Sequence, residues 1–490
     1  MAGAGTTPLR ADLAVVGAGA AGLYAALTAA RAGASVVLVS RSPLAESASY
    51  WAQGGIAAAL AEDDSPELHL EDTLTAGRNA SRESAARVLC EDSPARVREL
   101  EELGVHFDAD RHGALALGLE GGHSRRRVVH AGGSATGRRI TRDLSALVAT
   151  DDTIEVLERT TASAIWCRDG RCIGVVAEHA SGGGPVPVLA RGTVLATGGA
   201  AALWERTTNP RGAIGAGMSL AAAAGAELAD LEFMQFHPTA LVSSDGNDGF
   251  LITEAIRGEG ALLLNEEGER FVDELAPRDE VALAIAGQRA GGRAEVYLDM
   301  RSLDMSQFPN VATALGQAGL DPQRDLVPVA PAAHYTMGGV ATGLNGEASL
   351  PGLYAVGECA CNGLHGANRL ASNSLAECFV FGRRAALAAL DEPATPGDAG
   401  NAPPPGPPPV PPPETRRALW RCAGLERDAE HLERMTQDPF PLARMIARAA
   451  LARQESRGAH QRRDHPQVDP ALDHMHSVAC GEEPARFRRW

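Results

Sequence analysis

The stretch that decides the fold is ADLAVVGAGAAGLYAALTAARAGASVVLVSRS, residues 11–42. The apolar residues 13–16 predict a short strand, the Ala- and Leu-rich segment that follows predicts a helix, and residues 36–40 predict a second strand. The turn between strand and helix is rich in glycine, which allows a tight bend, a close approach to a pyrophosphate and close helix–strand packing. The helix N-terminus would supply N–H groups and a positive dipole for the phosphates. The sequence therefore predicts a βαβ unit that binds a dinucleotide.

One feature of the usual dinucleotide unit is missing. The second strand normally ends in an acidic residue that holds a ribose, whereas the sequence here is Ser40-Arg41-Ser42. An alternative is a helix–strand pair whose glycines hold no ligand. The order of strand, glycine turn, helix and second strand disfavours this alternative.

Composition limits the possible functions. The chain has 490 residues, of which 44% are hydrophobic and 22% charged, so it is long enough for two or three globular domains. Its net charge of −17 disfavours nucleic-acid binding. All 45 basic residues are Arg, which excludes a lysine Schiff base. There is no signal peptide and no apolar run long enough to span a membrane, so we expect a cytoplasmic protein without a membrane partner.

The eight cysteines are scattered and form no paired CxxC motif, so we predict no metal site. Cys359 and Cys361 form a CxC pair, which is more often two small buried residues than a metal or disulfide site. This cysteine pattern agrees with a reducing compartment.

The nucleotide domain is predicted to be discontinuous. Residues 151–200 contain several short strand patterns and end in an apolar strand at residues 192–200. A second strand expected to contact the nucleotide appears only at residues 350–360. Two such strands on either side of an insertion indicate a cofactor held between domains, with the substrate at their junction.

A proline-rich segment, APPPGPPPVPPP at residues 402–413, predicts an extended linker. Its alternative, a ligand for a proline-binding module, is less favoured because spacers are commoner. Residues 414–458 have helical periodicity. We therefore expect an α/β protein with these boundaries: a Rossmann-like nucleotide domain at 1–231 and 339–395, an inserted α+β capping domain at 232–338, a linker at 396–413 and a C-terminal helical domain at 414–490.

Five further stretches combine cationic side chains with glycine or small residues. They are EFMQFHPTAL (232–241), TEAIRGEGA (253–261), ELAPRD (274–279), HYTMGGV (334–340) and GLHGANRLASNSL (363–375). Buried cations in such number need anionic partners. A dicarboxylate substrate would provide them, with arginine and imidazole groups binding each carboxylate.

These motifs, together with YWAQGG (50–55), ATGG and AVGE, occur in the order found in the succinate dehydrogenase/fumarate reductase flavoprotein family. The chain resembles this family over about residues 10–465, and it most resembles the members that oxidise L-aspartate to iminoaspartate with O2 or fumarate as electron acceptor. The resemblance implies FAD as cofactor and a place at the start of the quinolinate route to NAD, with quinolinate synthase as a suggested partner. A soluble fumarate reductase is the alternative within the family.

The resemblance also implies roles for individual residues. The positions that match FAD contacts are Gly17, Ala18, Gly19, Ala20, Ala21, Gly22, Arg41, Ser49, Tyr50, Trp51, Ala52, Gln53, Gly54, Gly55, Glu358, Ser374 and Leu375. The positions that match substrate-carboxylate contacts are His237, Thr253, His334 and Arg369. Arg278 matches the family's proton-transfer arginine, with Glu254 and Arg257 as its relay.

Two departures concern the cofactor. Members with covalent flavin carry a His shortly before the QGG or EGG motif, and the matching stretch here is Ala48-Ser49-Tyr50. The resemblance therefore implies noncovalent FAD. Relatives also carry an Asp near FAD where this chain has Ala216, which puts the cofactor affinity in doubt.

The stretch LEGGHSRRRVVHAGG, residues 119–133, distinguishes the two activities. Aspartate-oxidising members carry an acid in this EGGHS motif, so Glu120 is predicted to bind the substrate's α-ammonium group. We expect Gly121 and Gly122 to act as a mobile hinge. We also expect residues 125–127 to be a solvated or partner-facing arginine run that keeps Glu120 ionised.

Overall fold

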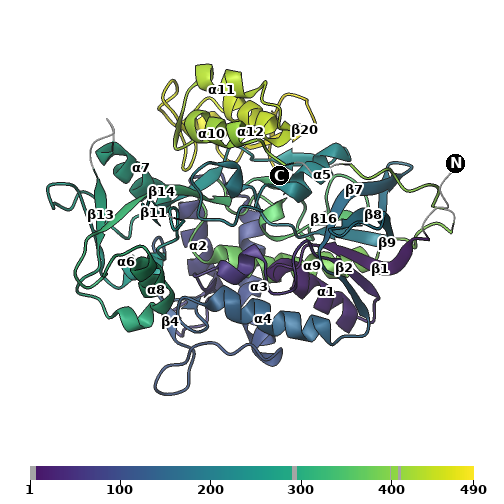
Figure 1. The fold of residues 1–490 in the computed structure, drawn as a ribbon, viewed down its shortest axis with the longest axis horizontal. Coiled ribbons are helices and arrows are strands. Elements are labelled where there is room, and N and C mark those ends of the chain that lie inside the picture. The colour runs from purple at the N-terminus through teal and green to yellow at the C-terminus, as the bar shows by residue number, and fades with distance from the viewer. Residues whose placement is uncertain (1–6, 245, 290–294, 398, 407–409) are drawn as a thin grey trace.

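The computed structural model describes residues 7–244, 246–289, 295–397, 399–406 and 410–490. Figure 1 shows three parts: a nucleotide domain around a large sheet, a second lobe built on β11, β13 and β14, and a cluster of C-terminal helices that lies over both. This arrangement confirms the predicted α/β class, with an inserted α+β lobe and C-terminal helices.

The main sheet has seven strands. Parallel pairing gives the order β6-β2-β1-β9-β16, and an antiparallel extension adds β8 and β7 beside the first half of β9. Helices α1 and α9 pack beside each other on this sheet, with α4 against α1 and α3 against α9. The bounds are β1 Leu9–Val16, β2 Val36–Val39, β6 Ile154–Leu157, β7 Thr160–Arg168, β8 Arg171–His179, β9 Pro185–Leu195, β16 Leu353–Ala355, α1 Ala20–Arg31, α3 Glu83–Glu102, α4 Thr136–Ala149 and α9 Asn373–Leu390.

The predicted βαβ unit is confirmed, and close backbone contacts explain why two of its positions are glycine. Gly17 has a φ of +112°, and a Cβ there would lie 2.3 Å from the Ala196 carbonyl oxygen. A Cβ on Gly22 would lie 1.9 Å from the Gly17 carbonyl oxygen. Only glycine therefore allows the turn to pass this close to the end of β9 and to the first turn of α1.

The second lobe contains an antiparallel sheet in the order β11-β14-β13-β12, with its own apolar core around Ile256, Leu298 and Val329. Helices α6, α7 and α8 accompany the sheet. The bounds are β11 Met234–Leu241, β12 Leu262–Leu264, β13 Val296–Asp299, β14 Val327–Thr336, α6 Glu254–Gly258, α7 Arg278–Gln288 and α8 Pro309–Gln317.

A five-stranded sheet in the order β17-β15-β10-β20-β21 joins distant parts of the chain. Its last two strands, β20 and β21, follow the C-terminal helices in the sequence. The remaining elements are β3 Ile56–Ala57, β4 Leu117–Gly118, β5 Val128–Val129, β10 Glu227–Ala229, β15 Gly339–Ala341, β17 Ala360–Cys361, β18 Glu426–Arg427, β19 Gln461–Arg462, β20 His476–Cys480, β21 Arg486–Arg488, α2 Pro66–Ala76, α5 Ala216–Ala223, α10 Pro413–Cys422, α11 Ala429–Met435 and α12 Pro441–Ala452.

Two predicted strands end earlier than expected. The strand predicted at residues 192–200 ends at Leu195, because the chain then turns along the glycine loop. The strand predicted at residues 350–360 is confined to Leu353–Ala355 and continues into a short 3₁₀ helix, Gly357–Cys359. In the proline-rich segment, residues 402–406 and 410–412 form no helix or strand, and residues 407–409 lie outside the described residues.

A buried network of charges fastens the C-terminal segment to the rest of the protein. Arg453 bonds Glu232 at 2.7 Å and Glu455 at 2.9 Å, and all three side chains are fully buried. Glu455 also binds Arg457, and Glu232 accepts a 2.6 Å hydrogen bond from Ser477 on β20. Because removing one partner of a buried pair leaves the other charge unpaired, this network should contribute strongly to stability.

We predict that Arg453→Leu destabilises the protein by about 3–5 kcal/mol, since it leaves Glu232 and Glu455 buried without their partner. The matched control is Arg463→Leu, because the Arg463 side chain is 60% exposed and lies 3.6 and 3.7 Å from its two carboxylate partners. Urea unfolding of the FAD-loaded proteins measures the effect. Equal midpoints for the two variants would contradict this role.

Candidate active site

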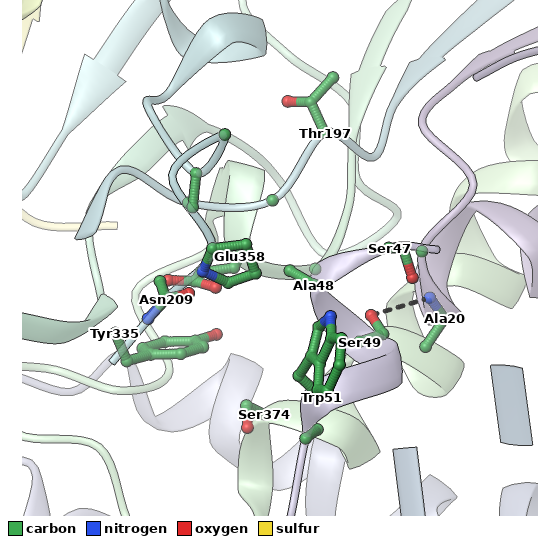
Figure 2. Close-up of a pocket in the computed structure, with 18 of the residues that line it drawn as sticks. Ala20, Ser47, Ala48, Ser49, Trp51, Thr197, Asn209, Tyr335, Glu358 and Ser374 are labelled. Atoms are coloured by element: carbon green, nitrogen blue, oxygen red, sulfur yellow. Dashed lines mark hydrogen bonds between the residues drawn. The ribbon is translucent and has the colours of Figure 1, made fainter. Parts of the chain in front are cut away.

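A cavity of about 910 Å³ runs along the carboxyl ends of β1, β2, β9 and β16 and continues to the second lobe. Ligands in open α/β folds bind at this edge of the sheet. Figure 2 shows Ala20 and Ser49 at one end of the cavity and Asn209 and Tyr335 at the other. One continuous cavity thus connects the positions predicted for cofactor and for substrate.

The first end is built on the N-terminus of α1. Gly19 caps this helix without any side-chain hydrogen bond, and the Ala20 N–H donates to the Ser49 hydroxyl at 3.1 Å. A Cβ on Gly19 would lie 3.1 Å from that hydroxyl oxygen, so the glycine leaves the helix N-terminus open to a ligand. Arg41 lines the same end and donates to the Gly212 carbonyl at 3.2 Å.

Several groups on the wall fit the predicted FAD. The Ser47 hydroxyl and the Gln53 carbonyl oxygen are buried, line the cavity and have no protein hydrogen-bond partner. Trp51 lines the cavity yet is 62% exposed, so its ring offers an apolar surface for a ligand to cover. Burial raises the pKa of Glu358 to about 7, although its carboxylate accepts a 2.9 Å hydrogen bond from the Thr336 N–H. These groups suit a long ligand with both polar and flat aromatic parts.

Ala216, where an Asp was expected, also lines the cavity. It is the first residue of α5, whose N-cap Gly215 is in the left-handed region with a φ of +68°. The helix N–H groups and dipole therefore remain at this wall, although the expected carboxylate is absent.

The other end gathers the side chains predicted to bind carboxylates. The rings of His237 and His334 lie 5.1 Å apart, and Thr253 and Arg369 share the cavity wall with them. His334 Nδ1 pairs with the Thr208 hydroxyl at 2.8 Å, so its other ring nitrogen is available. Four segments far apart in the sequence thus meet as predicted.

Electrostatics make this end a receptor for anions. Burial, together with the charge of Arg278, holds the pKa of both His237 and His334 well below the usual value, so both rings are neutral at physiological pH. Burial lowers the pKa of Arg369 to about 10, so it remains a cation there. The Nε atom of Arg369 is buried without a partner. A bound carboxylate would satisfy such a group.

Two hydrogen bonds and its position at the start of a helix hold Arg278 in place. Its Nε donates to Glu254 at 2.6 Å, its Nη1 donates to the Gln235 carbonyl oxygen at 3.1 Å, and it is the first residue of α7 after Pro277. Glu254 Oε1 lies 3.3 Å from Arg257 Nη2. The predicted trio of Arg278, Glu254 and Arg257 therefore forms a continuous chain of ionic groups that leads away from the cavity.

Glu120 is the acid in this cationic end. The carboxylate lines the cavity but is only 3% exposed; Oε2 accepts a 2.7 Å hydrogen bond from Ser372, and Oε1 has no hydrogen-bond partner. His130 Nε2 lies 3.5 Å from Oε1. Burial alone would raise the pKa of Glu120, but His130, Ser372 and Arg278 outweigh it and bring the pKa to about 2. Glu120 is therefore an anion with one free oxygen.

The expectations for the rest of this loop were partly wrong. Arg127 is not solvated; it is fully buried and bonds Asp64 at 2.8 and 2.9 Å and Asp72 at 2.5 Å. It anchors the loop, and it is His130, Ser372 and Arg278 that keep Glu120 ionised. Gly121 is needed for close packing rather than as a hinge, because a Cβ there would lie 2.2 Å from Glu254 Oε1.

Most of the predicted site residues line the cavity, but Gly22, Tyr50 and Arg257 do not. Gly22 packs against the glycine turn, Tyr50 contacts Trp51 edge-to-face, and Arg257 lies behind Glu254. Lining residues that the sequence did not single out include Ser47, Ala48, Thr197, Asn209 and Ser372. Ser372 lies in the motif at 363–375, and its hydroxyl donates to Glu120, 252 residues away in the chain.

Comparisons with known proteins agree with this site. Residues 12–375 match the family model described as FAD binding domain, and residues 428–487 match the model described as fumarate reductase flavoprotein C-term. The fold resembles that of the FrdA chain of quinol fumarate reductase from E. coli, with a TM-score of 0.88 and 30% identity over 99% of this chain and 96% of that one.

Two curated relatives are closer in sequence. The chain is 45% identical to the L-aspartate oxidase of Caulobacter vibrioides over 96% of both chains. It is 44% identical to that of Agrobacterium fabrum over 94% of this chain and 92% of the relative. Among the described residues, no helix has the length and apolar character needed to cross a membrane. On the family model and these relatives, the chain belongs to the L-aspartate oxidase family of FAD-dependent flavoproteins.

Proposed function

We propose that this protein oxidises L-aspartate to iminoaspartate with noncovalently bound FAD. The observation that carries the proposal is Glu120, a buried anion whose Oε1 accepts no hydrogen bond and which lines the same cavity end as Arg278 and Arg369. A buried carboxylate without a partner is costly. The α-ammonium group of aspartate would pair with it, whereas succinate and fumarate offer no such group.

The remaining contacts divide between the two carboxylates of the substrate. His237, Thr253, His334 and Arg369 would hold them, with neutral imidazoles and a hydroxyl giving directional hydrogen bonds and Arg369 giving charge. Because these groups come from both lobes, substrate binding would fill the junction and exclude water. The Cα–H bond would thereby be held in a fixed orientation.

FAD, when bound, would supply the two-electron oxidation that converts the amine of the substrate to an imine. Arginine is a poor base because its pKa exceeds about 12 in water. We therefore assign Arg278 to electrostatic positioning in aspartate oxidation. In fumarate reduction, Arg278 would donate a proton to the substrate and regain one through Glu254 and Arg257.

We also propose O2 and fumarate as electron acceptors and a role in NAD synthesis. O2 would yield hydrogen peroxide and fumarate would yield succinate. Iminoaspartate would enter quinolinate and NAD synthesis, with quinolinate synthase as the consuming partner. A cytoplasmic location accords with the eight cysteines, all of which are free thiols.

Soluble fumarate reductase is the rival, supported by the likeness to the FrdA chain. We predict that anaerobic L-aspartate bleaches the yellow flavin absorbance of the purified protein, because the site pairs the ammonium group with Glu120. Succinate is the matched ligand without that group and should bleach it far less. If aspartate leaves the spectrum unchanged while succinate reduces the flavin, the rival is correct.

The noncovalent binding of FAD is supported by the cavity wall. The segment that contains Ser47–Gly55 carries no histidine, and the lining histidines of the described cavity, His237 and His334, belong to the substrate end. Acid precipitation of the protein should therefore release all of the flavin into the supernatant. Yellow colour that remains in the washed pellet would refute this expectation.

We predict that Glu120→Gln separates the two activities. It removes the charge that pairs with the ammonium group, so kcat/KM for aspartate should fall by about 30-fold or more, in line with the loss of a buried charge pair. Fumarate reduction should be retained. The control is Glu259→Gln, an exposed glutamate at the end of α6. Equal losses in both reactions would mean that Glu120 only supports the fold.

A further inference from the structure

Arg369 binds the cavity wall through neutral groups. Its Nη1 donates to the Ser374 hydroxyl at 2.9 Å, and its guanidinium carbon lies 4.4 Å from the centre of the Tyr335 ring. No carboxylate among the described residues forms an ion pair with it within 4 Å, although Arg369 is only 4% exposed. A buried cation in this position needs another source of stabilisation.

Behind the Tyr335 ring lies a buried carboxylate. The Tyr335 hydroxyl donates to Glu377 Oε2 at 2.8 Å. His365 Nε2 contacts the same oxygen at 3.0 Å, and Asn362 donates to Glu377 Oε1 at 3.1 Å. All four side chains are at most 6% exposed, so both carboxylate oxygens are satisfied away from water. Burial and the charge of Glu377 raise the pKa of Tyr335 well above its usual value, which keeps the phenol a donor.

We infer that Tyr335 and Glu377 are positioning residues for Arg369: the carboxylate fixes the phenol, and the phenol face holds the guanidinium that receives a substrate carboxylate. This inference rests on the proposed function only for the assignment of Arg369 to the substrate. It assigns a role to Glu377, which does not line the cavity.

The arrangement has a physical reason. A carboxylate in direct contact with Arg369 would compete with the substrate for the same N–H groups. The Tyr335 ring instead offers its negative face, which attracts a cation without occupying those donors. Glu377 places an anion one side chain further back and holds the ring in one orientation through the hydroxyl. Arg369 is thereby both stabilised and left free to bind.

This role differs from that of Glu120 in specificity. Both aspartate and fumarate carry the carboxylates that the site binds, whereas only aspartate carries the ammonium group. Loosening Arg369 should therefore weaken both ligands to a similar extent. It should change substrate affinity more than the rate of the chemical step, because Tyr335 and Glu377 act through Arg369.

The test compares two tyrosine variants in the FAD-loaded enzyme. Tyr335→Phe keeps the ring and removes the hydrogen bond to Glu377. Tyr354→Phe is the matched control, because the Tyr354 hydroxyl donates to Glu392 at the same 2.8 Å and Tyr354 does not line the cavity. We expect Tyr335→Phe to raise KM for aspartate and for fumarate about tenfold, the equivalent of one hydrogen bond, with kcat nearly unchanged. Tyr354→Phe should leave both constants unchanged.

An equilibrium measurement makes the test independent of turnover. Succinate binding, followed by the perturbation of the flavin spectrum, should weaken about tenfold in Tyr335→Phe and further in Tyr335→Leu, which also removes the ring. The FAD content of each variant shows that the fold is intact. Wild-type affinity in Tyr335→Phe, or a loss confined to aspartate, would overturn the inference. A wild-type enzyme that binds succinate but is not reduced by aspartate would instead refute the proposed function alone.

Discussion

The site depends on one constraint: positive charge is buried at the junction of the two lobes without enough anions to balance it. Arg278 and Arg257 share one carboxylate, Glu254, and Arg369 lies over the ring of Tyr335. Burial, together with these cations, keeps His237 and His334 neutral. An anionic substrate completes this arrangement. The protein accordingly leaves buried polar groups unsatisfied at this junction, and the proposed dicarboxylate substrate would pair with them.

Hydrogen bonds and close packing hold these buried charged groups in place. The Glu120 loop is anchored by Arg127 and its two aspartates, and Gly121 lies against Glu254, so Glu120 and the ionic chain that contains Glu254 are packed together. Gln235 accepts from Arg278 and donates to the Arg369 carbonyl at 2.8 Å. Arg278 and Arg369 are thereby tied together by one carboxamide.

The sequence was most informative where a local rule applied. The glycine turn, the strand–helix–strand order and the short cationic motifs depend on neighbouring residues, and the structure brings nearly all of them to one cavity. It was least informative where a partner lies far away in the chain. The bond between Ser372 and Glu120, the burial of Arg127 against Asp64, and the network of Glu377 have no periodicity or spacing that would reveal them. The predicted end of β9 was also wrong, because the backbone just after Leu195 passes close to Gly17, far away in the sequence.

The position of β20 has a consequence for how the chain is made. In the five-stranded sheet, β10 pairs on one side with β15 and on the other with β20, so Leu228 lies between Val340 and Ala479. Because β20 lies far downstream of β10 in the sequence, β10 keeps an open edge during synthesis until β20 has been made. Open edges invite pairing with other chains. Completion of this sheet is thus a late step that closes an aggregation-prone surface and simultaneously places the C-terminal ion network.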